Sequence, residues 1–111
     1  MQAATSYAYN KRVNQYLNNE INQASPVQLI LKVYDFAILN CQRKNMLKTN
    51  EAIQVLINSL NFDIDGAREI SIGLLRLYHY CQDQARKNNF DETQRILTEL
   101  RDAWKQALTN R

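Results

Sequence analysis

The segment NQASPVQLILKVYDFAI, residues 22–38, decides the fold, because it contains the firmest helix start in the chain. Ser25 can accept a hydrogen bond from the backbone N–H of Gln28. The Gln28 side chain can return one to the N–H of Ser25, which would complete a capping box. Pro26 falls at the first helical position, where its missing N–H costs nothing. We therefore predict that a helix begins at Ser25-Pro26.

This first bundle helix has an apolar seam whose residues recur in steps of three and four, the spacing of one helical face: Val27, Ile30, Tyr34, Ala37 and Cys41. We expect the helix to end near Lys48, with Thr49 or Asn50 capping the next one. No Gly or Pro stands there. An uninterrupted helix through residues 44–52, which would exchange helices between two chains, is therefore an open alternative.

Three further amphipathic stretches follow, and we expect Asp65 to cap the third bundle helix and Asp91, with Gln94 in a capping box, to cap the fourth. The residues expected to face inward are Ile53, Leu56, Ile57 and Leu60; then Ile70, Leu74, Leu77, Tyr78, Cys81 and Ala85; then Ile96, Leu97, Leu100, Ala103, Trp104, Ala107 and Leu108. Short connections make sequential helices antiparallel neighbours. The predicted fold is all-α, an antiparallel up-and-down four-helix bundle over residues 25–111.

Residues 1–24 form a separate leader before the bundle. Tyr9, Val13, Tyr16 and Leu17 share one helical face. The apolar stripe is thin and asparagine is frequent, which is typical of a marginal helix that needs a surface to lie on. We predict a movable N-terminal leader helix that caps a groove of the bundle until a partner displaces it.

The composition argues against several classes of protein. The net charge is +3 and the basic residues are scattered, so nucleic acid is not an expected partner. No apolar run is long enough to span a bilayer, and the N-terminus lacks a signal-peptide pattern, so we expect a cytoplasmic protein without membrane insertion. Cys41 and Cys81 fit two buried thiols in a reducing compartment, with a disulfide between two helices as the alternative.

Residues for catalysis or for a cofactor are missing from the sequence. The only histidine, His79, has no Glu three residues before it, so the Glu-x-x-His motif of metal-binding bundles is lacking. Gly66 and Gly73 stand alone and form no phosphate loop. We expect no enzyme activity, no metal and no cofactor.

The chain has more large apolar residues than one inward stripe per helix can use, and such a surplus usually marks a partner-binding surface. The candidate partner-binding residues are Tyr7, Tyr9, Tyr16, Ile21, Leu29, Val33, Phe36, Ile72, Leu75 and Tyr80. The alternative is that the leader covers these residues permanently.

Two motifs resemble a known family. The first is Tyr16-x4-Ile21-x3-Ser25-Pro26-x2-Leu29-Ile30-x3-Tyr34-Asp35-x-Ala37-Ile38, and the second is Leu100-Arg101-x-Ala103-Trp104. They resemble the flagellar secretion chaperones of the FliS type. The residues expected to have a structural role are Ser25, Pro26 and Gln28, from the helix start, together with Tyr34 and Trp104, which stand in the family motifs. Phe36 stands where the family has Gly, and the stretch from Ile38 to Ser59 is shorter than expected by roughly two heptads of a helical hairpin.

The resemblance implies a cytoplasmic chaperone that binds the disordered C-terminal segment of flagellin. Such a chaperone prevents premature polymerisation and delivers its cargo to the flagellar type III export apparatus, with an export gate protein as a second candidate partner. The protein would be a monomer or a homodimer. The alternative is a homodimeric helical adaptor, or a regulator with another protein partner.

Overall fold

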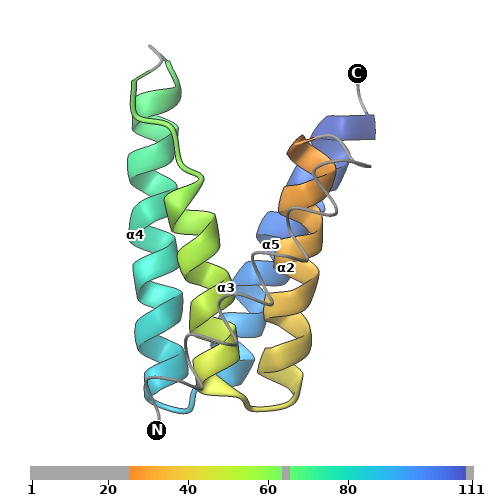
Figure 1. The fold of residues 1–111 in the computed structure, drawn as a ribbon, viewed down its shortest axis with the longest axis vertical. Helices are drawn as coiled ribbons and strands as arrows, with labels where there is room; N and C mark the ends of the chain where they lie inside the picture. Colours follow the sequence, from red (N-terminus) through yellow and green to blue (C-terminus); the bar gives the residue numbers. More distant parts are fainter. Residues whose placement is uncertain (1–25, 64–65, 110–111) are drawn as a thin grey trace, which may run out of the picture. The chain divides into compact units, whose positions relative to one another are not determined.

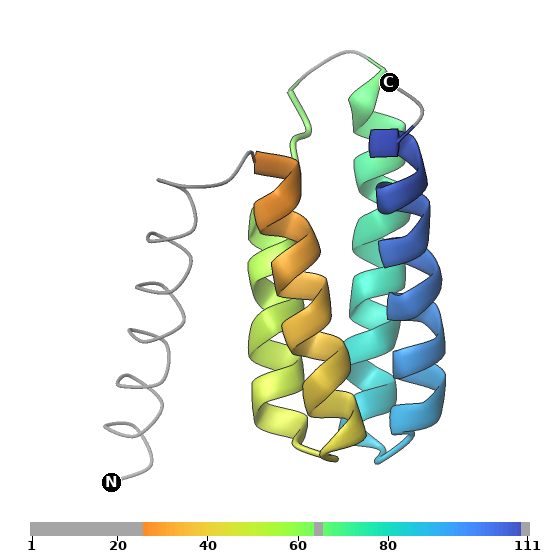
Figure 2. The same ribbon diagram turned by 90° about the vertical axis from the view of Figure 1, so that its right-hand side faces the viewer.

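The computed structural model describes residues 26–63 and 66–109, and every regular element in these ranges is a helix. The helices are α2 (Pro26–Gln42), α3 (Met46–Asn58), α4 (Ala67–Arg86) and α5 (Phe90–Thr109), as Figure 1 shows. The chain from Leu31 onward forms one compact unit. Within it, consecutive helices run in opposite directions (Figure 2). The predicted all-α four-helix bundle is confirmed.

The first connection ends α2 earlier than the sequence suggested. Lys44 adopts a left-handed conformation with φ of 55°. Its backbone N–H donates to the carbonyl of Cys41 at 3.0 Å, and the N–H of Asn45 donates to the carbonyl of Asn40 at 2.9 Å. This pair of bonds is a Schellman motif, which satisfies the last carbonyls of a helix and stops it. The prediction of a helix reaching Lys48 was wrong, because a lysine takes the position that glycine usually fills.

The cap of α3 also differs from the prediction. Asn45 precedes the helix with an extended backbone, and its side chain accepts a hydrogen bond from the N–H of Lys48 at 3.0 Å. Thr49 and Asn50, the expected caps, lie inside α3. Since the chain turns at residues 43–45, the structure has no uninterrupted helix through residues 44–52.

The connection between α4 and α5 contains a second Schellman motif. Asn88 is left-handed with φ of 63°, and the N–H of Asn89 donates to the carbonyl of Gln84 at 2.8 Å. Helix α5 therefore begins at Phe90, and Asp91 lies in its first turn instead of capping it. At the start of α4 the cap position belongs to Gly66, and Asp65 lies outside the described residues.

A hydrogen-bonded aromatic cluster lies at the centre of the core. Tyr34 is fully buried and Tyr78 nearly so, and their hydroxyl oxygens are 2.5 Å apart. The indole N–H of Trp104 donates to the Tyr34 hydroxyl at 3.2 Å. Burial raises the pKa of both tyrosines above the ordinary value of 10.0, so both hydroxyls stay neutral. The cluster joins α2, α4 and α5.

The acidic residue of the opening segment has a partner on α5. Asp35 is exposed, and its carboxylate lies 3.0 Å from the guanidinium of Arg101. An ion pair of this exposure contributes little stability. Asp35 points away from the core, toward Arg101. This exposed position explains why a charged residue can stand within an apolar run.

Several residues that were expected to face inward do not. Ile70 and Leu77 on α4 are exposed, as are Ala103 and Ala107 on α5. In contrast, the polar residue Gln82 is buried on α4. The buried face of α4 therefore includes a polar residue beside Tyr78, Cys81 and Ala85, and part of the apolar stripe of α4 remains at the surface.

Candidate partner-binding groove

The interface between α3 and α4 is closed by reciprocal hydrogen bonds. The side chain of Asn50 donates to the backbone carbonyl of Gln82 at 3.1 Å, and the Gln82 side chain donates to the carbonyl of Asn50 at 3.2 Å. Gln82 also donates to the side-chain oxygen of Gln54 at 3.3 Å. Gln82 is buried, so its hydrogen bonds also avoid the cost of an unpaired polar side chain. This interface fixes α4 against α3.

The interface between α4 and α5 is held mainly near their connection. There the Thr93 hydroxyl donates to the backbone carbonyl of Cys81 at 3.1 Å, and both residues are fully buried. Away from the connection the two helices diverge (Figure 1). The space between them is a groove of about 420 Å³ lined by Leu77, Tyr80, Arg95, Ile96, Glu99 and Leu100.

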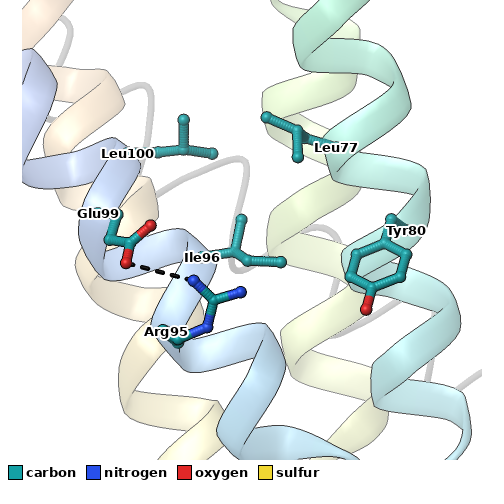
Figure 3. Close-up of a pocket in the computed structure, with 6 residues that line it drawn as sticks. All are labelled: Leu77, Tyr80, Arg95, Ile96, Glu99 and Leu100. Atoms are coloured by element: carbon teal, nitrogen blue, oxygen red, sulfur yellow. Dashed lines mark hydrogen bonds and ion pairs between the residues drawn. The ribbon is translucent and has the colours of Figure 1, made fainter.

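The groove has an apolar interior. Figure 3 shows Leu77 of α4 and Leu100 of α5 pointing toward one another across it, with Ile96 and Tyr80 nearer the connection. Ile96 is buried, whereas Leu77 is 39% and Tyr80 45% exposed. Two large apolar side chains of α4 thus remain accessible beside buried apolar atoms of α5, which is the usual composition of a partner-binding groove.

The apolar surface continues along α4 beyond the groove. Ile70 precedes Leu77 by two helical turns, so the two side chains lie on one face of α4. Ile70 is 66% exposed, the largest value among the large apolar residues that the structure describes. The exposed strip formed by Ile70, Leu77 and Tyr80 matches the spacing with which an amphipathic helix presents its own apolar side chains.

Charged side chains on α5 form one rim of the groove. Arg95 binds the carboxylate of Glu92 on one side and lies 3.3 Å from Glu99 on the other (Figure 3 shows the latter pair). The hydrogen bond with Glu92 is the main cause of the raised pKa of Arg95. The rim therefore has an arginine that stays charged and two carboxylates, of which Glu99 is largely exposed.

The cysteines are unsuited to chemistry. Both thiols are free and buried, which confirms the prediction of buried thiols. Burial raises the pKa of Cys41 to about 11 and that of Cys81 to about 12. At neutral pH both stay protonated and unreactive.

Within residues 26–63 and 66–109, no three His, Cys, Asp or Glu side chains are grouped so that they could hold a metal ion. No helix there is both long and apolar enough to cross a membrane.

The structure distributes the predicted partner-binding residues widely. Tyr7, Tyr9, Tyr16 and Ile21 lie outside the described residues. Leu29 lies in the first turns of α2, Val33 is buried in the core, and Phe36, Ile72 and Leu75 are half-buried. Among the members of the set that the structure describes, Tyr80 lines the groove.

Sequence reasoning missed most of the groove. Leu77, Ile96 and Leu100 had been assigned to inward faces, and Arg95 and Glu99 had not been considered. The available signal was the spacing of Ile70, Leu77 and Tyr80, which places three large apolar residues on a second face of α4.

The residues with an expected structural role are placed as follows. Pro26 is the first residue of α2. Gln28 lies in the same first turn, while Ser25, its expected capping partner, is outside the described residues. Tyr34 and Trp104 form part of the aromatic cluster.

Comparison with known proteins agrees with this architecture. The family model of the flagellar protein FliS matches residues 8–111. The flagellar secretion chaperone FliS of Bacillus subtilis (strain 168) is 28% identical to this chain over 110 residues, and the match covers 84% of this chain and 83% of that protein. Because the family model spans nearly all of the sequence, the chain belongs to the FliS family of flagellar proteins.

Proposed function

We propose that this protein is a flagellar export chaperone that binds the disordered C-terminal segment of flagellin in the α4–α5 groove. In this role it prevents premature polymerisation and delivers flagellin to the flagellar type III export apparatus. Membership of the FliS family and the similarity to a flagellar secretion chaperone support the general role. An export gate protein is the second partner that this role calls for.

The observation that supports cargo binding most directly is the exposed apolar interior of the groove. Leu77 and Tyr80 are accessible, and Ile96 and Leu100 lie beside them. An amphipathic helix of the cargo could place side chains spaced by three and four residues between α4 and α5. Ordering a disordered segment costs free energy, and burial of apolar surface is the term that offsets this cost.

The groove also favours stoichiometric binding over chemistry. Its lining consists of Leu77, Tyr80, Ile96 and Leu100 and one ion pair, between Arg95 and Glu99. The charged rim would restrict the cargo to a helix whose polar face can lie beside Arg95 and Glu99. Binding of this kind requires a groove that is complementary to the flagellin segment, and it requires no cofactor.

The test is calorimetric titration of the full-length protein with a C-terminal flagellin peptide from the same organism. One-to-one binding with a large negative heat-capacity change is expected, because a disordered apolar segment is buried. Leu77→Gln should weaken the affinity by about tenfold, since a polar group then enters the apolar interior.

Leu47→Gln is the matched control. Leu47 is exposed on α3, outside the groove, and the substitution makes the same chemical change. It should leave the affinity for the peptide unchanged. An absence of peptide binding together with a stable dimer on size-exclusion chromatography would contradict the chaperone proposal and favour the homodimeric adaptor.

We further propose that residues 1–24 act as a movable leader that competes with cargo for the groove. The support is the apolar face of Tyr9, Val13, Tyr16 and Leu17 on an otherwise polar segment. Under this proposal Tyr16→Gln tightens peptide binding, because a weaker competitor is easier to displace. An unchanged affinity in the Tyr16→Gln variant would refute the role of the leader while leaving cargo binding intact.

A further inference from the structure

Two basic connections lie next to each other at one end of the bundle. The connection between α2 and α3 contains Arg43 and Lys44, and the one between α4 and α5 begins at Lys87, directly after Arg86. Figures 1 and 2 both show these connections at the same end. All four side chains are exposed. Basic residues that are scattered in the sequence are thus brought together by the antiparallel topology.

Acidic residues at this end offset part of the positive charge: Asp91 lies in the first turn of α5, next to Glu92, which is bound to Arg95. Lys87 lies 3.2 Å from Asp83, in a pair that is more than half exposed on both sides. Arg43, Lys44 and Arg86 form no ion pair with another described residue. The helix dipoles add little, because two helices end and two begin at this end of the bundle. The positive potential therefore comes from the side chains.

Exposed apolar side chains accompany the basic ones. Met46 and Leu47 directly follow the first connection and are 40% and 50% exposed, and Leu39, four residues before Arg43 on α2, is 40% exposed. None of these three residues lines the α4–α5 groove. The end of the bundle thus combines cationic groups with apolar groups that the core does not use, so it differs in character from the cargo groove.

We propose that this basic end of the bundle, formed by Arg43, Lys44, Arg86 and Lys87 with Leu39, Met46 and Leu47, docks on an anionic membrane surface. A layer of anionic headgroups is the electrostatic complement of clustered Lys and Arg residues. Leu47 and Met46 can enter the headgroup region to a shallow depth, as apolar residues of peripheral proteins do. Two short turns side by side form no helical groove for a peptide, whereas a lipid surface requires none.

Docking of this kind leaves the proposed cargo groove accessible. The groove is lined by residues of α4 and α5 and by none of the connection between them. The two surfaces share no residue. The basic end would thus concentrate the protein at the cytoplasmic face of a membrane without occupying the site proposed for flagellin. The inference does not depend on what the groove binds.

The test is co-sedimentation of the full-length protein with vesicles of phosphatidylcholine alone and of phosphatidylcholine mixed with phosphatidylglycerol. We expect binding to the anionic vesicles that falls as salt is added, and little binding to the neutral ones. The double variants Arg43→Gln/Lys44→Gln and Arg86→Gln/Lys87→Gln should each lower the partition coefficient by about tenfold.

Matched controls separate this surface from the rest of the molecule. Arg68→Gln/Lys105→Gln removes two exposed positive charges, one near the start of α4 and one near the end of α5, far from the α4–α5 connection, and should leave vesicle binding nearly unchanged. Leu47→Gln should weaken binding to vesicles but not to the flagellin peptide, and Leu77→Gln should do the reverse. Circular dichroism of each variant confirms that it is folded.

Three outcomes would overturn the proposal. One is an absence of binding to anionic vesicles. Another is an equal loss of binding in the Arg68→Gln/Lys105→Gln control, which would show that only net charge matters. The third is binding of a soluble polyglutamate peptide through the same four residues without vesicle binding, which would assign the basic end to an acidic protein partner. Each outcome is independent of the flagellin titration.

Discussion

Helix α4 has two very different interfaces. Toward α3 it is closed by the polar side chains of Gln82, Asn50 and Gln54, which exchange part-buried hydrogen bonds. Toward α5 it keeps Leu77 and Tyr80 partly exposed above a groove. The polar side of the helix is the closed one and the apolar side is the open one. Hydrophobicity alone therefore does not indicate which face of a helix is buried within its own chain.

The difference follows from geometry. Reciprocal hydrogen bonds need a fixed distance between the two backbones, and they hold α3 and α4 together. Between α4 and α5, the hydrogen bond from Thr93 to Cys81 acts close to the connection. Farther along, apolar contacts are left to bridge two diverging helices. Such contacts tolerate exchange of partners, as binding of a client requires.

The largest expected effect is in the closed part of the core. Leu56 on α3 is 1% exposed, so Leu56→Ala should lower the free energy of unfolding by about 2–5 kcal/mol through lost burial and a cavity. Urea denaturation followed by circular dichroism measures it. Leu47→Ala, at a half-exposed site of the same helix, should change it by less than about 0.5 kcal/mol. Equal effects would mean that α3 does not pack as described.

The hydrogen bonds of the closed interface come next. Gln82→Ala removes two interhelical hydrogen bonds, to the Asn50 carbonyl and to the Gln54 side chain, which together should cost about 1–3 kcal/mol. The measurement is again urea denaturation. Gln106→Ala, at an exposed position of α5, is the control and should have little effect. If both variants were equally stable, apolar packing alone would hold α3 against α4.

The buried thiols should make stability depend on alkaline pH. Burial raises the pKa of Cys41 to about 11 and that of Cys81 to about 12, from an ordinary value of 9.0. Above pH 9 the unfolded chain loses thiol protons that the folded chain keeps. The stabilisation is therefore complete below pH 9 and is lost as the pH rises toward 11–12. Between pH 9 and pH 10 each thiol should cost about 1 kcal/mol.

The measurement for the thiols is the urea midpoint as a function of pH, compared with the variant Cys41→Ala/Cys81→Ala. Lysines and the other tyrosines titrate in both proteins, so only the difference in slope reports on the thiols. A double variant with the same slope as the unmodified protein would show that the two thiols are accessible to water.

The smallest expected effect is at the open interface. Leu77 is 39% exposed, so Leu77→Ala should lower the free energy of unfolding by only about 1 kcal/mol, because little additional surface is exposed. Urea denaturation with an unchanged slope checks this. A loss comparable to that of Leu56→Ala would show that the groove belongs to the permanent core, and would weaken its assignment as a partner-binding site.

Local sequence rules located the helices but misplaced some of their ends. The start of α2 at Pro26 and the four-helix count followed from capping residues and apolar spacing. The end of α2 did not, because Lys44 adopts a left-handed conformation that sequence rules reserve for glycine or asparagine. The same motif at Asn88 uses a residue that tolerates this conformation better.

The sequence was also insufficient to predict which face of α4 is buried. Periodicity grouped Ile70 and Leu77 with Tyr78 and Cys81, because all four lie on a broad apolar sector. The structure buries Tyr78 and Cys81 and exposes Ile70 and Leu77. The choice depends on where neighbouring helices lie, which a single helix does not encode.

By itself the sequence determined the fold class, the helical character of residues 26–42 and the buried thiols, since capping, periodicity and composition act within one helix. Tertiary structure alone decided that Gln82 is buried, that Leu77 and Tyr80 border a groove, and that Arg43 and Arg86 share one end of the bundle. These features depend on distances between helices that are remote in the chain. Such distances are fixed by packing and interhelical hydrogen bonds, which no local pattern specifies.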